Sequence, residues 1–108
     1  MTMTVCQIAR TTHGVEIAES ADHGVRLCVV GALDARTAET FAAAADLAFD
    51  ERPEELDLDL RGVTDAGAEG VTAVSACLAR GRFLVRGVRV AVATDAGRRL
   101  LLASMSTV

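Results

Sequence analysis

Two alternating carboxylates are the first side chains in this sequence that could do chemistry. Asp57 and Asp59 alternate with leucines, so both point to one face of an extended strand. Paired carboxylates on one face can act as general acid and base. No His, Lys or Ser lies nearby in the sequence to complete such a site. The alternation therefore favours a solvated strand face over catalysis.

The cysteines and histidines form no ligand set. Cys6, Cys28 and Cys77 are odd in number, widely spaced and without a Cys-x-x-Cys pair, which argues against a disulfide framework and a structural zinc site. We expect reduced, largely buried thiols that pack as small hydrophobes. A redox pair between two of them is the alternative. His13 and His23 each lie in a glycine-flanked turn, far from other ligands, so we expect no metal site.

The glycine-rich stretch after these carboxylates is the third candidate. Gly62, Gly67 and Gly70 punctuate a predicted turn that follows the strand. The apolar period then changes to that of a helix with one buried stripe, formed by Val71, Val74 and Leu78. The start of such a helix points unpaired N–H groups and a positive dipole end outward, which suits an anion or an acidic partner group. The same geometry also occurs without a ligand.

The remaining segments place strands and helices in alternation around this unit. Short strands are expected at residues 15–18, 25–30, 56–60 and 88–92, and helices before residue 49, at about 70–79 and after residue 95. Strands joined through helices should be parallel neighbours. One aliphatic and one charged strand face predict helices mainly on one side of the sheet. The fold class is therefore α/β, with about four strands in a mixed sheet and three helices mainly on one face.

Length and composition limit the protein to one small domain. Of the 108 residues, we assign residues 1–13 to a loose arm or short strand and residues 14–108 to the domain. Aromatic residues make up only 3 %, so the core must consist of Val, Leu and Ala. The net charge of −4 and the lack of long charged blocks argue against a nucleic-acid partner. No apolar run or leader suggests a membrane or export, so we expect a cytoplasmic protein.

The order of elements and several local stretches resemble the STAS domain, a module shared by sulphate transporters and bacterial anti-anti-sigma factors. Residues 31–41 resemble the family's Gly-Glu-Leu-Asp turn and the helix after it. Residues 59–63 resemble the Asp-Leu-x-x-Val that ends its third strand, and residues 94–101 its last strand-to-helix step. The resemblance covers about residues 15–103.

The family's signature loop, Asp-Ser-Ser-Gly, is the part that differs most. Its four positions fall on Gly67, Ala68, Glu69 and Gly70, and only the last glycine matches. In members regulated by phosphorylation the first Ser accepts a phosphoryl group, but Ala68 has no hydroxyl to accept one. Glu69 instead supplies a permanent carboxylate, which resembles phosphoserine only in part. Its other interpretation is a first-turn acid that helps the helix to start.

The resemblance implies a non-catalytic regulatory protein that binds an anti-sigma factor or a serine-kinase-like partner through the loop before the second helix. The implied contact residues are Asp34, Arg36, Thr37, Gly67, Ala68, Glu69 and Gly70. By its position Asp34 is equally a helix cap, as is Thr37. These two stretches should be neighbours, because parallel strands end at the same edge of a sheet.

Two other functions stay open beside this one. The alternative is a STAS module that senses a nucleotide or another anion at the start of the second helix. A small enzyme is the third hypothesis, but the sequence holds no nucleophile and base pair or phosphate loop. We expect no cofactor and no metal. A homodimer stays open, as one way of covering a sheet edge.

Overall fold

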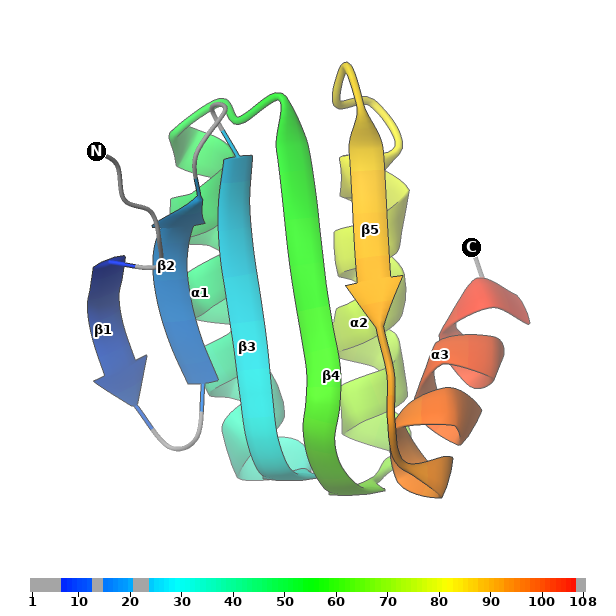
Figure 1. The fold of residues 1–108 in the computed structure, drawn as a ribbon. Coiled ribbons are helices and arrows are strands. Elements are labelled where there is room, and N and C mark those ends of the chain that lie inside the picture. Colours follow the sequence, from blue (N-terminus) through cyan, green and yellow to red (C-terminus); the bar gives the residue numbers. More distant parts are fainter. Residues whose placement is uncertain (1–6, 13–14, 21–23, 107–108) are drawn as a thin grey trace.

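The computed structural model describes residues 7–12, 15–20 and 24–106, with side chains described for Val15 and from residue 24 onward. Strands and helices follow one another as the sequence predicted, with one strand more (Figure 1). The elements are β1 (Gln7–Thr12), β2 (Val15–Ser20), β3 (Gly24–Leu33), α1 (Ala35–Asp50), β4 (Glu55–Ala66), α2 (Ala68–Gly81), β5 (Gly87–Ala91) and α3 (Asp95–Ser106).

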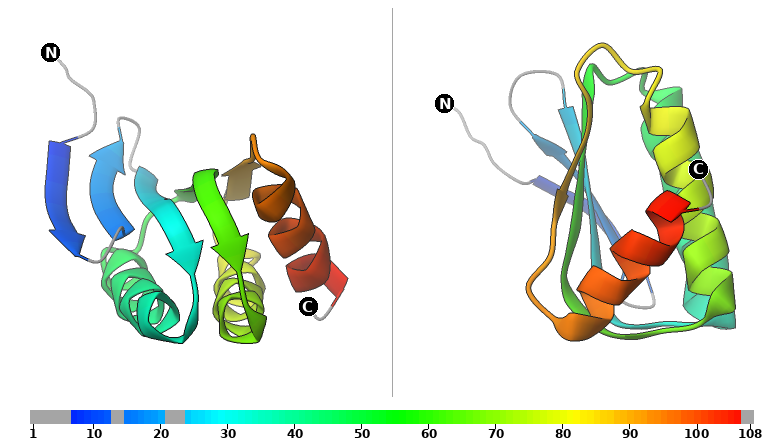
Figure 2. Two further views of the ribbon diagram at one scale, coloured as in Figure 1. Left: turned by 90° about the horizontal axis from the view of Figure 1, so that it is seen from below. Right: turned by 90° about the vertical axis from the view of Figure 1, so that its right-hand side faces the viewer.

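The described strands form one mixed sheet in the order β1-β2-β3-β4-β5. β2 pairs antiparallel with both β1 and β3, whereas β4 pairs parallel with β3 and β5. The three helices all lie on one face of the sheet (Figure 2). The predicted α/β class with three helices on one face is therefore right. The predicted count of about four strands is too low, because β1 adds a fifth.

The core lies between the sheet and the helices and is aliphatic. The inward side chains of β3 and β4 alternate with outward polar ones, and Leu27, Leu56 and Leu60 are completely buried. Phe41 of α1 is the only aromatic among the completely buried side chains. Each such side chain contributes roughly 1.5–3 kcal/mol relative to leaving it exposed. The alternation that predicted these strands is thus the pattern that fills the core.

β4 continues well beyond the predicted end at residue 60. Gly62, predicted to lie in a turn, lies inside the strand, next to a shift in the pairing register with β3. A Cβ atom at Gly62 would lie 3.2 Å from the carbonyl oxygen of Val29. Glycine here permits a close approach of two backbones at a bulge, so it does not end the strand.

The side chain of Thr94 caps the last helix. Its hydroxyl accepts a hydrogen bond from the N–H of Gly97 at 2.9 Å and donates to the carbonyl of Val63 at 2.6 Å. The cap therefore also ties the start of α3 to β4. None of the helices within the described ranges combines the length and the apolar composition that crossing a bilayer requires.

The two described cysteines differ in burial. Cys77 is 2 % exposed on the inner face of α2, and burial raises the pKa of its thiol to about 12. Cys28 is only half-buried on the open face of the sheet, so the prediction of a largely buried thiol is wrong for it. Both are reduced thiols. The remaining cysteine, Cys6, lies outside the described residues.

We expect thiol reagents to distinguish these two cysteines in the folded protein. In a variant that keeps only Cys77, labelling in native buffer should be very slow at pH 8, because the thiolate is disfavoured and access requires opening of the core. In the matched variant that keeps only Cys28, labelling should be clearly faster. Equal rates in native buffer, measured by mass spectrometry, would contradict the position of Cys77 in the core.

Candidate functional site

The ends of β3 and β4 bring the two predicted contact stretches together. Leu33, the last residue of β3, pairs with Ala66, the last residue of β4. The N–H of Gly67 then donates a hydrogen bond to the carbonyl of Leu33 at 3.0 Å. The residues that follow the two strands are therefore adjacent at the carboxyl edge of the sheet, where α1 and α2 both begin (Figure 1).

A capping box builds the first half of this edge. The Asp34 carboxylate accepts hydrogen bonds from the N–H groups of Arg36 and Thr37 at 3.1 and 3.2 Å. The Thr37 hydroxyl accepts from the N–H of Asp34 and donates to the carbonyl of Ala32, both at 2.8 Å. These hydrogen bonds lower the pKa of Asp34, and those with Thr37 have the largest effect. Both predicted cap residues thus take part, and α1 starts in a fixed position.

The exposed groups of this half are the Asp34 carboxyl group and the Arg36 side chain, whereas Thr37 is half-buried. Asp34 is thus both a cap and an exposed acid, so the two interpretations of this residue are compatible. Arg36 adds a positive charge beside it.

The start of α2 forms the second half and differs from the predicted loop. Gly67 alone separates β4 from α2, while Ala68, Glu69 and Gly70 already form the first helical turn. Ala68 and Glu69 are exposed and Gly67 is half-buried. Gly70, predicted to belong to the contact surface, is buried against Leu33. It therefore has no exposed surface to offer a partner.

The first-turn amides of α2 are not capped by a side chain. Gly67 occupies the cap position and provides no side-chain hydrogen bond, whereas α1 has Asp34 and α3 has Thr94. Glu69 stands in the first turn, where a carboxylate interacts favourably with the helix dipole. The start of α2 thus has N–H groups that can donate hydrogen bonds to a partner's oxygen atom.

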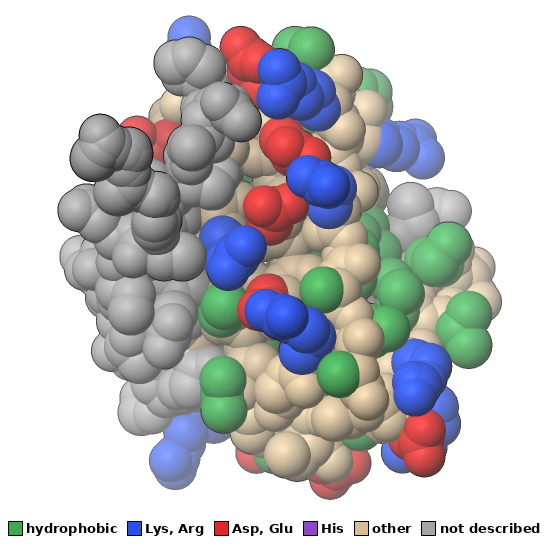
Figure 3. Space-filling view, viewed as in Figure 1, with side chains coloured by type: hydrophobic (Ala, Val, Ile, Leu, Met, Phe, Trp, Pro, Cys, Tyr) green, Lys and Arg blue, Asp and Glu red, His purple; other side chains and the backbone are tan. Residues whose placement is uncertain are grey.

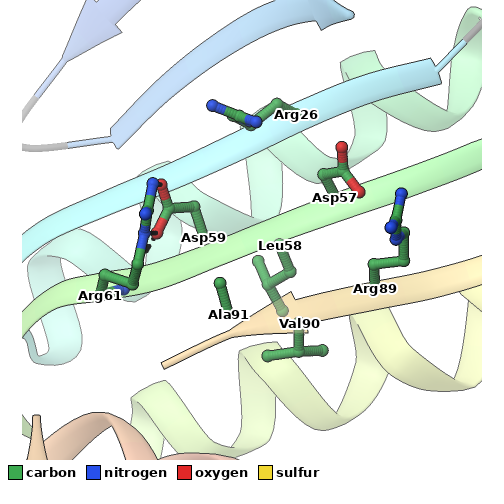
Figure 4. A pocket seen from close by; sticks show the side chains of 8 residues that line it. All are labelled: Arg26, Asp57, Leu58, Asp59, Arg61, Arg89, Val90 and Ala91. Atoms are coloured by element: carbon green, nitrogen blue, oxygen red, sulfur yellow. Dashed lines mark hydrogen bonds and ion pairs between the residues drawn. The ribbon is translucent and has the colours of Figure 1, made fainter. Parts of the chain in front are cut away.

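The face of the sheet opposite the helices is highly charged (Figure 3). Its central row runs in register across three parallel strands, from Arg26 through Asp57 to Arg89. The side chains surround a shallow, open hollow of about 330 Å³ (Figure 4). Asp57 and Asp59 lie on this face, as the alternation predicted. The last residues of β4 separate them from the start of α2.

Asp59 is paired, which the sequence analysis missed. The Arg61 guanidinium donates hydrogen bonds to both Asp59 carboxylate oxygens at 3.0 Å (Figure 4). The Cys28 thiol contacts one of these oxygens at 3.3 Å. Chiefly because of Arg61, the pKa of Asp59 falls to about 2. A carboxylate held in this way is a poor general base. The signal was the spacing of Asp59 and Arg61, since residues two apart on a strand share a face.

A metal site has no support in the described part of the chain. No group of three His, Cys, Asp or Glu side chains there lies close enough together to hold an ion.

We expect the Asp59 and Arg61 pair to matter for stability only above pH 2. Because the folded-state pKa of Asp59 is below its usual value of 3.8, the contribution is complete above pH 4 and is lost as the pH falls toward 2. Since Arg61 is exposed, the contribution should be about 1 kcal/mol or less. Asp59→Asn should therefore reduce the free energy of unfolding at pH 6 and not at pH 2. Asp57→Asn is the control that leaves the pair intact, and an unchanged pH dependence in Asp59→Asn would contradict the assignment.

Comparison with known proteins gives matches in structure alone. No family model and no curated protein matches the sequence. The crystal structure of an anti-sigma factor antagonist from Mycobacterium paratuberculosis matches with a TM-score of 0.71 and 24 % identity, over 86 % of this chain and 79 % of that one. The anti-sigma factor antagonist SpoIIAA in its unphosphorylated form matches with a TM-score of 0.59 and 20 % identity, over 82 % of this chain and 81 % of that one.

At these identities the two matches bear on the fold. Each covers more than four fifths of this chain. The chain therefore has the STAS-type fold of anti-sigma factor antagonists.

Proposed function

We propose that this chain is a non-catalytic, cytoplasmic regulatory protein that acts as an anti-sigma factor antagonist and binds an anti-sigma factor or a serine-kinase-like protein. The observation that carries the proposal is the fold, which two anti-sigma factor antagonists share over more than four fifths of this chain. The composition, which leaves little material for a deep pocket, also favours a binding surface over an active site.

The proposed contact surface is the carboxyl edge of the sheet where α1 and α2 begin. We assign to it Asp34, Arg36, Thr37, Gly67, Ala68 and Glu69, with Gly70 as the buried support beneath them. None of these residues has a large apolar side chain that folding must bury. Charges of both signs stand on the surface, so charge complementarity would contribute to partner choice and to the rate of association.

The uncapped amides of α2 support the location. A backbone carbonyl or a carboxylate of the partner could accept hydrogen bonds from them, as an N-cap side chain does in α1. The same amides favour the second candidate function, a module that senses a nucleotide or another anion. Titration with a nucleoside triphosphate, followed by the amide resonances of Ala68 and Glu69, separates the two, because only the second requires these resonances to shift without a protein partner.

Ala68 makes control by phosphorylation at the usual position impossible. We expect a STAS-directed serine kinase and ATP to leave residues 60–70 unmodified, because Thr64 is the only hydroxyl between Leu60 and Gly70 and belongs to β4. Mass spectrometry after incubation checks this. Phosphate on Thr64 would show a shifted acceptor and restore a phosphorylation switch.

We expect Glu69→Lys to weaken partner binding by roughly tenfold or more, which corresponds to about 1.4 kcal/mol. The exchange reverses a charge at the centre of the proposed surface. Its cost to stability should be only about 0.5–1 kcal/mol, through the helix dipole. The first measurement is capture of the partner from native cytoplasm, with parent and variant as baits, followed by affinity and thermal unfolding.

Asp57→Lys on the open sheet face is the matched control. It introduces the same change of charge at the centre of the other exposed face. If Asp57→Lys abolishes binding while Glu69→Lys binds like the parent, the partner docks on the open sheet and the surface proposed here is wrong.

A further inference from the structure

Two consecutive carbonyl groups at the end of β3 hold the two halves of the proposed surface. The carbonyl of Ala32 accepts the Thr37 hydroxyl of α1 at 2.8 Å. The next carbonyl, that of Leu33, accepts the N–H of Gly67 at 3.0 Å, directly before α2. The starts of both helices are thus tied to adjacent peptide groups of one strand. Leu33 itself is completely buried, so this strand end is anchored in the core.

Gly70 lies against the same carbonyl, with no room for a side chain. A Cβ atom there would be 2.6 Å from the Leu33 carbonyl oxygen and 3.0 Å from Leu33 Cγ. Because the oxygen belongs to a backbone that is held in the sheet, it cannot turn aside as the end of a flexible side chain could. Any side chain at Gly70 would therefore push the first turn of α2 away from β3.

Gly67 and Gly81 provide comparisons within the same helix. At Gly67 the backbone is extended, and the nearest atom to an added Cβ is Glu69 Oε1 at 3.4 Å, an ordinary contact. At Gly81, the last residue of α2, an added Cβ would overlap Cγ2 of Val88. Gly81 is thus a second glycine without room, but at the opposite end of the helix from the proposed surface.

We propose that Gly70 is the positioning residue of the contact surface: by allowing α2 to touch the Leu33 carbonyl, it fixes Ala68 and Glu69 relative to Asp34 and Arg36. The inference rests on the function proposed above. It adds that the surface is complete before a partner arrives, so that binding has no ordering of the two helix starts to overcome. No phosphoryl group or ligand would then be required to assemble it.

Two alanine variants, one at each end of α2, test this role. We expect Gly70→Ala to lower affinity by roughly tenfold or more for the protein that the parent captures and Glu69→Lys does not. Gly81→Ala should lower the melting temperature yet keep the affinity. Helix propensity alone would make alanine at position 70 stabilising, so it cannot account for a loss.

Amide hydrogen exchange tests the contact between the start of α2 and the Leu33 carbonyl without any partner. In the parent, the Gly67 amide should be protected well above the amides of Ala68 and Glu69, because it alone of the three is bonded to Leu33. Gly70→Ala should remove most of that protection, and Gly81→Ala should not. If Gly70→Ala does not fold, the exchange rates of the parent still decide the question.

Two outcomes would overturn the proposal. One is an unprotected Gly67 amide in the parent. The other is a folded Gly70→Ala variant that binds as tightly as the parent, or a Gly81→Ala variant that loses affinity as much as Gly70→Ala does. Failure to capture any partner would instead count against the proposed function, since the exchange measurements do not depend on one.

Discussion

The parallel pairing of β3 with β4 is the constraint on which the rest of the structure depends. Parallel neighbours cannot be joined by a tight turn, so the chain must cross over between them, and α1 provides this crossover. The pairing also aligns the leucines and valines of both strands toward α1 and α2. Because the two strands end together, the two helix starts that follow them are brought to one edge. Fold, core and candidate surface therefore share one origin.

The features that the sequence predicted correctly are those set by local periodicity. Alternating leucines in β4 and the apolar stripe of α2 give strand and helix without reference to distant residues. The adjacency of the ends of β3 and β4 follows from topology, because neighbouring parallel strands run in the same direction and end at the same edge of the sheet. These steps require only the order of elements and their type.

The features that could not be predicted depend on contacts between distant residues. Gly62 has the composition of a turn, but the neighbouring backbone of β3 makes it a bulge within β4. Gly70 belongs to an exposed loop by pattern, yet Leu33 buries it. For residues 1–13 the sequence left a loose arm and a short strand as alternatives, and the strand β1 within them is defined by its pairing with β2. In each case the structure is decided by contacts with residues that are distant in the sequence.

The open face and the carboxyl edge carry charge in different ways. On the open face Arg61 engages Asp59, and Arg89 lies 3.4 Å from Glu55, so much of the charge is balanced within the protein. At the carboxyl edge, Asp34 is engaged by the backbone of its own helix, and Glu69 stands exposed in the first turn of α2. This contrast supports the edge as the surface that meets a partner.

The edge strand β5 has a further consequence for the behaviour of the protein in concentrated solution. Of the described strands it pairs with β4 alone, so its other side presents backbone groups to which a second sheet could add. Arg89, at the middle of this short strand, has a side chain that is 72 % exposed. Antiparallel pairing of two copies centred on that residue would set two guanidinium groups opposite each other, which is unfavourable. The charge of Arg89 therefore disfavours edge-to-edge growth of the sheet in that register.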